Sequence, residues 1–511
     1  MTAKNIMFQG TGSHVGKSVI AAALCRILYQ DGYRVAPFKS QNMALNSFVT
    51  KDGGEMGRAQ VVQAEAAGIE PHVDMNPILL KPTGNATSQV VVLGRPVGNM
   101  TAKEYHLNWT TRGLEVAMEA YRRLAERFDV IVIEGAGSPA EINLRETEIV
   151  NMRIAKLTGA PVVLVGDIDK GGVLAQLVGT LELLSEEERE LVAGFIINKF
   201  RGDVSLFQPA VEFLEQKTGK PVLGIVPYFQ GFRVPEEDSV LLEEERVSGG
   251  DCPALEVAVI RLPRISNFTD FDPLEEEPDV RLRYVHRGER LGNPDLIIIP
   301  GSKNTIEDLL YLRRSGLEAE IVAAARRGVP VIGICGGFQM LGEVLADPLG
   351  TESAVPEVNG LGLLPVETVF EPDKVTCQVE ATVLPEAGPL LAGAEGMRVE
   401  GYEIHMGRSL LRSGGRPVFC ITSRRGEKVE VLDGACRDDL PVFGTYIHGI
   451  FDNDKLRRHI LDRVRERKGL KPLGEESQVS MKELRERSFN LLADTVRAAL
   501  DMEKIYRIIG L

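Results

Sequence analysis

The sequence predicts an α/β protein with two doubly wound, mostly parallel sheets in succession and a helical C-terminal tail. Three observations predict this fold class. Short apolar runs rich in β-branched residues alternate with stretches that are apolar at helical spacing. The alternation stops in a polar, acidic stretch at residues 236–252 and then resumes. Beyond residue 455 the chain is charged and helix-forming.

The first series of strands is expected within residues 1–235, which we predict to form one domain. Residues 18–29 and 115–127 lie between strands and are apolar at helical spacing. Because parallel strands need crossover connections, usually helices, we expect a mostly parallel sheet with helices on both faces. The candidate strands are Ile6–Gln9, Arg34–Pro37, Val130–Glu134, Pro161–Val165, Gly194–Asn198 and Val222–Val226.

A second domain is expected at residues 253–455, after a linker at residues 236–252. Residues 456–511 are predicted to form a helical extension, in which residues 481–500 are amphipathic. We expect this tail to pack on its own domain. The candidate strands of the second series are Glu256–Arg261, Asp295–Pro300, Val329–Ile334 and Pro441–Ile447.

Composition and charge limit the possible functions. The 511 residues suffice for about two to four domains. With 59 basic and 73 acidic residues, the net charge of −14 argues against non-specific binding to nucleic acid or to anionic membranes. The six scattered cysteines, without a C-x-x-C pair, indicate neither a disulfide framework nor a zinc site. With no signal-like or membrane-spanning apolar run, we expect a cytoplasmic protein.

The first candidate site follows the first strand. Residues 10–18 read Gly-Thr-Gly-Ser-His-Val-Gly-Lys-Ser and open a helix, in an elongated form of the common phosphate-binding pattern. Glycines let backbone N–H groups approach phosphate, the lysine neutralises the β- and γ-phosphates, and the serine binds Mg²⁺. A structural turn is the alternative. We assign ATP contacts to Gly10, Thr11, Gly12, Gly16, Lys17, Ser18 and, for the purine base, Asn198.

A magnesium ion bound with the nucleotide needs oxygen ligands. The apolar run 130–133 ends in Glu134, which resembles a Walker-B position at the carboxyl end of a strand, where open α/β sheets bind ligands. Glu55, in a glycine-rich turn, is a further candidate. The predicted metal ligands are therefore Ser18, Glu55 and Glu134, and a solvent-facing Glu134 is the alternative.

Two polar segments are expected at the same sheet edge as the phosphate-binding loop. Residues 37–43 follow the second strand, and residues 167–172 follow the strand that ends at Val165. Because an acceptor substrate must lie near the transferred phosphate, we assign substrate contacts there, although ordinary loop polarity would give a similar composition. The predicted substrate residues are Lys39, Gln41, Asn42 and Asp169.

The second candidate site is a thiol. The apolar run Val329–Ile334 leads directly to Cys335, and glycines stand at positions 333, 336 and 337. A buried strand, a tight turn and a helix form a nucleophile elbow, and amides at a helix start favour the thiolate. The alternative is a small buried core residue.

A catalytic thiol needs a base and an oxyanion hole. His448 ends an apolar strand and precedes a glycine, which presents a side chain at a sheet edge. His405 is the second choice, and an ordinary core or surface histidine is the alternative for each. The loop after the run 296–299 and the elbow itself offer backbone N–H donors, at Gly301, Ser302 and Gly336.

These motifs resemble known families. The Pro-Gly-Ser loop, the Gly-Ile-Cys-Gly-Gly elbow and the histidine after Gly-Thr-Tyr are similar to class I glutamine amidotransferases, and the elongated loop resembles dethiobiotin-synthetase-like P-loop ATPases. The cobyric acid synthase family of cobalamin biosynthesis joins the two in this order, and the resemblance covers essentially the whole chain. Its most specific stretches are Pro37–Ser47, Glu134–Leu144, Asp167–Gly172, Ser266–Pro273, Pro300–Thr305 and Gly401–Gly407.

The resemblance implies an ATP- and glutamine-dependent amidation. Cys335 would form a glutamyl thioester while His448 moves the proton, and the ammonia would reach the other domain by an enclosed route. There MgATP would convert a substrate carboxylate to an acyl phosphate, which ammonia displaces. The implied acceptor is a corrinoid, adenosylcobyrinic acid a,c-diamide, amidated at its b, d, e and g carboxylates to adenosylcobyric acid. No nucleic-acid or membrane partner is implied.

One position departs from the wider amidotransferase pattern. Ile450 stands where a glutamate two residues after the histidine orients the imidazole. Asp452, Glu403 or a backbone carbonyl are the candidates for this role, and a Cys–His dyad is a further possibility. Two other functions stay open: a cobyrinic acid a,c-diamide synthase, and a ParA/MinD-like ATPase switch with a degenerate amidotransferase domain. The sequence does not predict the oligomeric state.

Overall fold

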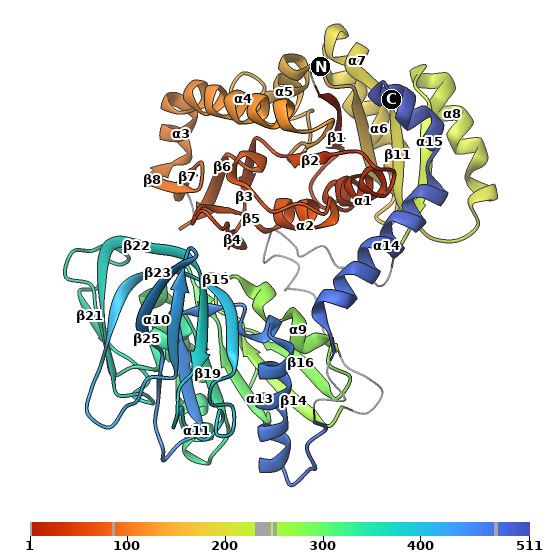
Figure 1. Ribbon diagram of the computed structural model, residues 1–511. Coiled ribbons are helices and arrows are strands. Elements are labelled where there is room, and N and C mark those ends of the chain that lie inside the picture. The colour runs from red at the N-terminus through yellow and green to blue at the C-terminus, as the bar shows by residue number, and fades with distance from the viewer. Residues whose placement is uncertain (1–2, 84–86, 230–246, 249–252, 475–478) are drawn as a thin grey trace. The chain divides into compact units, whose positions relative to one another are not determined.

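The computed structural model describes residues 3–83, 87–229, 247–248, 253–474 and 479–511. The chain forms two compact units. Unit 1 comprises Met1–Ala44, Met56–Glu237 and Lys482–Leu511, and unit 2 comprises Leu45–Glu55 and Asp238–Met481. Each unit has a mostly parallel central sheet with helices, which confirms the predicted fold class (Figure 1). The predicted linker at 236–252 lies outside the described residues except for positions 247–248.

Unit 1 is built on a six-stranded parallel sheet with the order β12-β11-β10-β1-β9-β2. Its central strands are apolar and buried, as expected for a parallel sheet covered on both faces. β1 pairs with both β9 and β10, so the loops at their carboxyl ends meet at one edge. The strands are β1 (Lys4–Gly10), β2 (Val35–Phe38), β9 (Val130–Glu134), β10 (Val162–Asp167), β11 (Val192–Phe200) and β12 (Val222–Pro227).

Helices and a smaller sheet complete unit 1. The smaller sheet has the order β3-β6-β7-β8, with strands at Gln41–Met43, Ile78–Pro82, Thr87–Val92 and Arg95–Thr101. No helix among the described residues is both long enough and apolar enough to cross a membrane. The helices are α1 (Lys17–Gln30), α2 (Arg58–Ala66), α3 (Ala102–Asn108), α4 (Thr110–Arg127), α5 (Met152–Thr158), α6 (Val173–Leu183), α7 (Glu186–Leu191) and α8 (Gln208–Thr218).

The C-terminal tail corrects one expectation. We expected it to pack on the domain that it follows, but α14 (Met481–Ala499) and α15 (Met502–Ile509) pack in unit 1, where Figure 1 draws them in blue. Phe489 lies in the same apolar core as α1. Arg26 of α1 forms an ion pair with Glu486 at 2.6 Å. An amphipathic pattern predicts that a helix buries one face, but it does not identify the surface that covers it.

Unit 2 contains a seven-stranded sheet with the order β13-β16-β14-β17-β19-β27-β26. Its inner strands are parallel, and short antiparallel strands form the edges. The strands are β13 (Val247–Ser248), β14 (Leu255–Ile260), β16 (Val280–Val285), β17 (Leu296–Ile299), β19 (Val331–Ile334), β26 (Ala435–Cys436) and β27 (Val442–Thr445). The accompanying helices are α9 (Asp272–Glu275), α10 (Thr305–Ser315), α11 (Leu317–Arg326), α12 (Gly336–Leu341) and α13 (Asp454–Arg467).

Unit 2 also contains a second, mostly antiparallel sheet that the sequence analysis did not identify. Its two long strands are half exposed, so neither contains the continuous apolar run that predicts a buried strand. Their pairing also contains a register shift. β23 pairs with β28, which places Tyr402 opposite His448. The strands are β20 (Val344–Ala346), β21 (Glu357–Asn359), β22 (Val366–Val383), β23 (Arg398–Leu411), β24 (Phe419–Arg424), β25 (Glu427–Asp433) and β28 (Ile447–His448).

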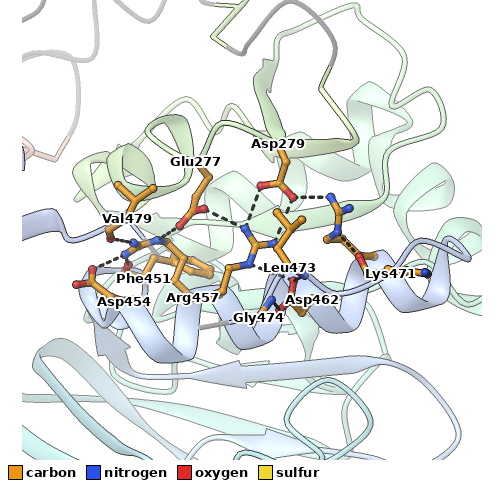
Figure 2. Close-up of polar contacts among 12 residues, drawn as sticks. Glu277, Asp279, Phe451, Asp454, Arg457, Asp462, Lys471, Leu473, Gly474 and Val479 are labelled. Atoms are coloured by element: carbon orange, nitrogen blue, oxygen red, sulfur yellow. Dashed lines mark hydrogen bonds and ion pairs between the residues drawn. The ribbon is translucent and has the colours of Figure 1, made fainter. Parts of the chain in front are cut away.

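Buried ion pairs fix α13 in unit 2. Figure 2 shows Arg457 of this helix beside Glu277, which with Asp279 precedes β16. The carboxylate of Glu277 accepts from Arg457 at 2.7 Å and from Arg458 at 3.0 Å. Arg458 also contacts Asp279 at 3.0 Å. Because each guanidinium is paired, the side chains of two adjacent arginines can be buried here.

Candidate active sites

The loop after β1 forms the predicted phosphate-binding turn. Gly16 has a left-handed conformation with φ of 95° and precedes α1, whose first residue is Lys17. The Lys17 ammonium turns back over the loop and donates to the carbonyl oxygen of Gly12 at 2.8 Å. A hollow of about 200 Å³ beside the loop is lined by Thr11, Gly12, Ser13, Val15, Asp167, Lys170 and Gln176. The loop therefore offers amides, a cation and open space at a helix N-terminus.

Asn198, at the carboxyl end of β11, lies against this loop. Its side-chain amide donates to the carbonyl oxygen of Val15 at 2.9 Å. A Cβ on Gly16 would lie 2.1 Å from the same amide nitrogen, so only glycine fits where the two segments meet. Asn198 thus supports the loop directly, and its predicted contact with a purine base stays a prediction.

Glu134 ends β9 beside the loop and is buried. Ser18 Oγ donates to its Oε1 at 2.8 Å, Gln63 Nε2 donates to its Oε2 at 2.6 Å, and Lys39 Nζ lies 3.1 Å from Oε1. Burial by itself would raise the pKa of Glu134. The charge of Lys39, with the hydrogen bonds from Gln63 and Ser18 and the charge of Lys17, instead holds this pKa below its usual range. The carboxylate is therefore ionised at neutral pH.

The oxygens of Ser18 and Glu134 fit a magnesium ion bound with a nucleotide. Mg²⁺ in such sites takes one or two protein oxygens and completes its shell with phosphates and water. Among the residues that the structure describes, no group of three or more His, Cys, Asp or Glu side chains is arranged to hold a metal ion by itself. Glu55 belongs to unit 2, where its carboxylate lies 2.6 Å from Lys374 Nζ. A metal role for Glu55 stays a prediction.

The predicted substrate residues have different surroundings. Lys39 is buried next to the β9 carboxylate, and Asn42 is buried as well. Gln41 accepts a hydrogen bond from the hydroxyl of Tyr105 at 2.5 Å. Asp169 is exposed and forms an ion pair at 2.7 Å with an arginine of the loop after β11. Lys39 thus contacts Glu134, one of the predicted magnesium ligands, and the substrate roles of all four stay predictions.

Cys335 has the geometry of a nucleophile elbow. It lies between β19 and α12 with φ of 51° and ψ of −107°, a backbone conformation that is costly for a residue with a side chain. A Cβ at Gly337 would lie 1.9 Å from the carbonyl oxygen of Ile299, so the tight turn requires glycine there. The thiol is largely buried and lies 3.6 Å from the carbonyl oxygen of Ile404.

His448 is held by a carboxylate that the sequence analysis missed. Its Nδ1 lies 2.6 Å from Oδ2 of Asp270, whose other oxygen accepts from the amide of Gly449 at 3.2 Å. Burial by itself would lower the pKa of His448. The charge of Asp270 and the hydrogen bond to it, with a further contribution from Cys335, raise this pKa to about 10. Apart from Cys335, Nε2 has no hydrogen-bond partner among the described residues, so it is available for the reaction.

Asp270 therefore takes the role for which Asp452, Glu403 and a backbone carbonyl were candidates. Glu403 instead pairs with Arg424 at 2.9 Å. The second-choice base, His405, stacks on Tyr446 with 3.7 Å between ring centroids. Asp270 lies in the specific stretch Ser266–Pro273, in the short helical turn after β14. The sequence could have identified Asp270 as an acidic residue that follows the carboxyl end of a central strand, which is the argument that identified Glu134.

The three predicted oxyanion-hole residues lie together near the thiol and the imidazole. A Cβ on Gly336 would be 2.9 Å from the backbone nitrogen of Ser302, and a Cβ on Gly301 would be 3.2 Å from Cε1 of His448. The hydroxyl of Ser302 donates to Asp308 at 2.7 Å. Because the side chain is already bonded, the backbone N–H groups of these residues are the candidate donors to an oxyanion, a role that stays a prediction.

The chain is similar to known proteins over both of its halves. Residues 6–241 match the model of the CobQ/CobB/MinD/ParA nucleotide binding domain, and residues 256–456 match the CobB/CobQ-like glutamine amidotransferase domain. Cobyric acid synthase of Pelotomaculum thermopropionicum is 57% identical, over 100% of this chain and 97% of that protein. Cobyric acid synthase of Moorella thermoacetica is 57% identical, over 100% of this chain and 98% of that protein. The chain therefore belongs to the cobyric acid synthase family of glutamine-dependent amide synthases.

Proposed function

We propose that the chain uses ATP and glutamine to amidate the b, d, e and g carboxylates of adenosylcobyrinic acid a,c-diamide, which gives adenosylcobyric acid. The observation that carries the proposal is the presence of two complete candidate centres in one chain. One is the Cys335–His448–Asp270 set, and the other is the phosphate-binding loop with Ser18 and Glu134. The full-length similarity to proteins named cobyric acid synthase supports this substrate.

In unit 2, the thiolate of Cys335 attacks the side-chain carbonyl carbon of glutamine. Amides of Gly336 and of the Gly301–Ser302 strand stabilise the oxyanion that forms. His448, which is protonated because of Asp270, gives its Nε2 proton to the departing nitrogen, so that the C–N bond breaks and ammonia leaves. Water then hydrolyses the glutamyl thioester, which releases glutamate and restores the thiolate.

In unit 1, the γ-phosphoryl group of ATP is transferred to a carboxylate of the corrinoid. Backbone amides of residues 10–16 and the Lys17 ammonium hold the phosphates. A magnesium ion held by Ser18 and Glu134 would neutralise charge that develops on them. The acyl phosphate is needed because hydroxide is a poor leaving group. Ammonia attacks its carbonyl carbon, and inorganic phosphate leaves with formation of the amide.

The test is incubation of the full chain with adenosylcobyrinic acid a,c-diamide, MgATP and glutamine, followed by mass spectrometry. We expect four successive conversions of a carboxylate to an amide, with glutamate, ADP and phosphate as the other products. A parallel incubation replaces the diamide with cobyrinic acid; amidation there at the a and c positions, with no conversion of the diamide in the first incubation, would identify an a,c-diamide synthase. ATP hydrolysis without amide formation would contradict the proposal and favour an ATPase switch.

A further inference from the structure

A segment from the nucleotide-binding half of the sequence packs beside the candidate glutamine-hydrolysing centre. Residues 45–55 follow Ala44 and precede Met56, both of which belong to unit 1, yet the segment itself belongs to unit 2. It contains the short strand β4 (Ser47–Val49), which pairs with β5 (Glu55–Gly57). We call Leu45–Glu55 the inserted segment.

The inserted segment contacts the aromatic ring that stacks on the catalytic imidazole. The rings of Tyr402 and His448 are nearly parallel, with 5.1 Å between centroids and an angle of 13°. Phe48 packs against Tyr402 with 5.6 Å between centroids. Val49 is buried in the same cluster, with Tyr402 and Ile404. Tyr402 therefore contacts the inserted segment and the imidazole at the same time.

The inserted segment also contacts the turn that carries Asp270. The backbone N–H of Ser47 donates to Oδ1 of Asn267 at 3.2 Å, and the hydroxyl of Ser47 lies 3.4 Å from the same atom. Asn267 has a left-handed backbone, with φ of 52°, and begins the short helical turn Phe268–Phe271. Asparagine adopts this conformation more readily than most residues. The two contacts from Ser47 hold the side chain of Asn267 and therefore help to fix the start of the turn.

A third contact leads toward the thiol. Ile404, which packs with Val49, presents its carbonyl oxygen 3.6 Å from Sγ of Cys335. The inserted segment thus touches a neighbour of each of the three residues in the candidate centre. Because these contacts reach the centre through Tyr402, Asn267 and Ile404, the role of the segment is one of positioning.

The inserted segment is itself fixed at both ends of its turn. Gln378 donates to the carbonyl oxygen of Val49 at 2.9 Å, and Glu55 and Lys374 form a buried ion pair. Three residues after Glu55, α2 begins, and its Gln60 and Gln63 both donate to the carboxylate at the end of β9. The chain that supports the imidazole therefore continues directly into a helix of the candidate nucleotide site.

We propose that the inserted segment is a positioning element for glutamine hydrolysis. Through Tyr402 and Asn267 it fixes His448 and Asp270 relative to Cys335, so that production of ammonia depends on a segment encoded within the nucleotide-binding half. The proposal rests on the roles proposed above for Cys335 and His448.

The test compares two phenylalanine truncations in the full chain. Phe48→Ala removes the ring that packs on Tyr402. Phe207→Ala is the matched control, because Phe207 is also half-buried and its ring also lies 5.6 Å from an aromatic partner, but in unit 1. The measurements are kcat and KM for glutamine hydrolysis across pH, and the pH dependence of iodoacetamide labelling of Cys335, followed by peptide mass spectrometry.

We expect Phe48→Ala to lower kcat for glutamine hydrolysis about tenfold, with little change in KM. The stabilisation that one aromatic pair gives to the positioned imidazole corresponds to about a tenfold change in rate. Labelling of Cys335 at neutral pH should slow, because a misplaced imidazolium activates the thiol less. Phe207→Ala should match the wild type in both measurements. Tyr402→Leu should behave like Phe48→Ala, whereas Tyr402→Phe, which keeps the ring and loses only the hydroxyl that donates to the carbonyl oxygen of Ser47 at 3.4 Å, should lower kcat less.

If thermal melting shows that Phe48→Ala does not fold, the comparison of Tyr402→Phe with Tyr402→Leu tests the positioning role instead. Wild-type kinetics and labelling in Phe48→Ala, or in Tyr402→Leu, would overturn the positioning role while the proposed function stands. Hydrolysis of glutamine that persists in Cys335→Ser would overturn the proposed function and the positioning role together.

Discussion

At the residue scale, the candidate glutamine-hydrolysing centre combines one strained residue with two buried, charged ones. Cys335 is held at positive φ by the turn between β19 and α12. His448 and Asp270 are buried, and the hydrogen bond between them keeps the imidazole protonated at neutral pH. His448 is therefore an imidazolium whose ring orientation the carboxylate fixes.

Replacement of Asp270 should impair catalysis through His448. Asp270→Asn keeps the shape but removes the charge that raises the pKa of His448 to about 10. We expect kcat/KM for glutamine hydrolysis to fall about 100-fold, as for loss of effective acid–base catalysis, and the alkaline limb of its pH profile to move toward neutral pH. Asp452→Asn is the control and should leave both unchanged. An unaltered alkaline limb in Asp270→Asn would exclude Asp270 as the orienting group.

A second buried carboxylate predicts a pH dependence of stability. Burial raises the pKa of Asp433 to about 7, although Thr445 and the amide of Tyr446 donate to its oxygens. Since the folded pKa lies above the ordinary value of 3.8, this residue stabilises the fold most in acid. That stabilising contribution is lost as the pH rises through about 7, because the unfolded chain ionises this carboxyl group at a lower pH than the folded protein does.

Asp433→Asn should therefore raise the melting temperature relative to the wild type at pH 8.5 and show a smaller difference at pH 5. Differential scanning calorimetry at the two pH values measures this. An equal shift at both pH values would mean that the carboxyl group titrates alike in the folded and unfolded chain.

At the element scale, local patterns predicted some elements and not others. The strand before Cys335, the strand before His448 and the loop after β1 are recognisable because apolar runs end in glycine-rich turns. Asp270 was missed because its partner lies 178 positions away along the chain. Likewise, the half-exposed strands β22 and β23 lack a continuous apolar run, and the surface that covers α14 is set by tertiary packing.

The junction of α13 with the strand β16 gives a prediction of stability (Figure 2). Glu277→Gln removes the charge that faces two buried guanidiniums, those of Arg457 and Arg458. Removing one partner of a buried pair costs about 3–5 kcal/mol of unfolding free energy. We expect the lower end, about 3 kcal/mol, because Arg457 keeps its ion pair with Asp454 and Arg458 keeps its pair with Asp279. Chemical denaturation measures the change.

The control is Glu318→Gln, which removes a more exposed ion pair with Arg313. Its expected cost is about 0–1 kcal/mol. Similar losses in Glu277→Gln and Glu318→Gln would show that the buried cluster contributes no more than a surface pair.

At the scale of the whole molecule, the order of the sequence and the division into units differ. Residues 45–55 leave the first half of the chain to join unit 2, and residues 482–511 leave the second half to join unit 1. Sequence patterns predicted two mostly parallel sheets, which the structure contains, and the roles of the two candidate centres stay predictions. They did not predict that these two segments pack in the other unit. The segments are short or amphipathic, and neither property identifies the core against which a segment packs.

We propose that Cys335 makes ammonia that is consumed at the site of Lys17. The most direct test measures amide formation in Cys335→Ser and Lys17→Ala with either glutamine or ammonium chloride as the nitrogen source, beside MgATP and the corrinoid. Cys335→Ser should form no amide from glutamine but retain amidation with ammonium chloride. Lys17→Ala should still hydrolyse glutamine but form no amide from either source. Amidation from glutamine by Cys335→Ser, or from either source by Lys17→Ala, would contradict the claim.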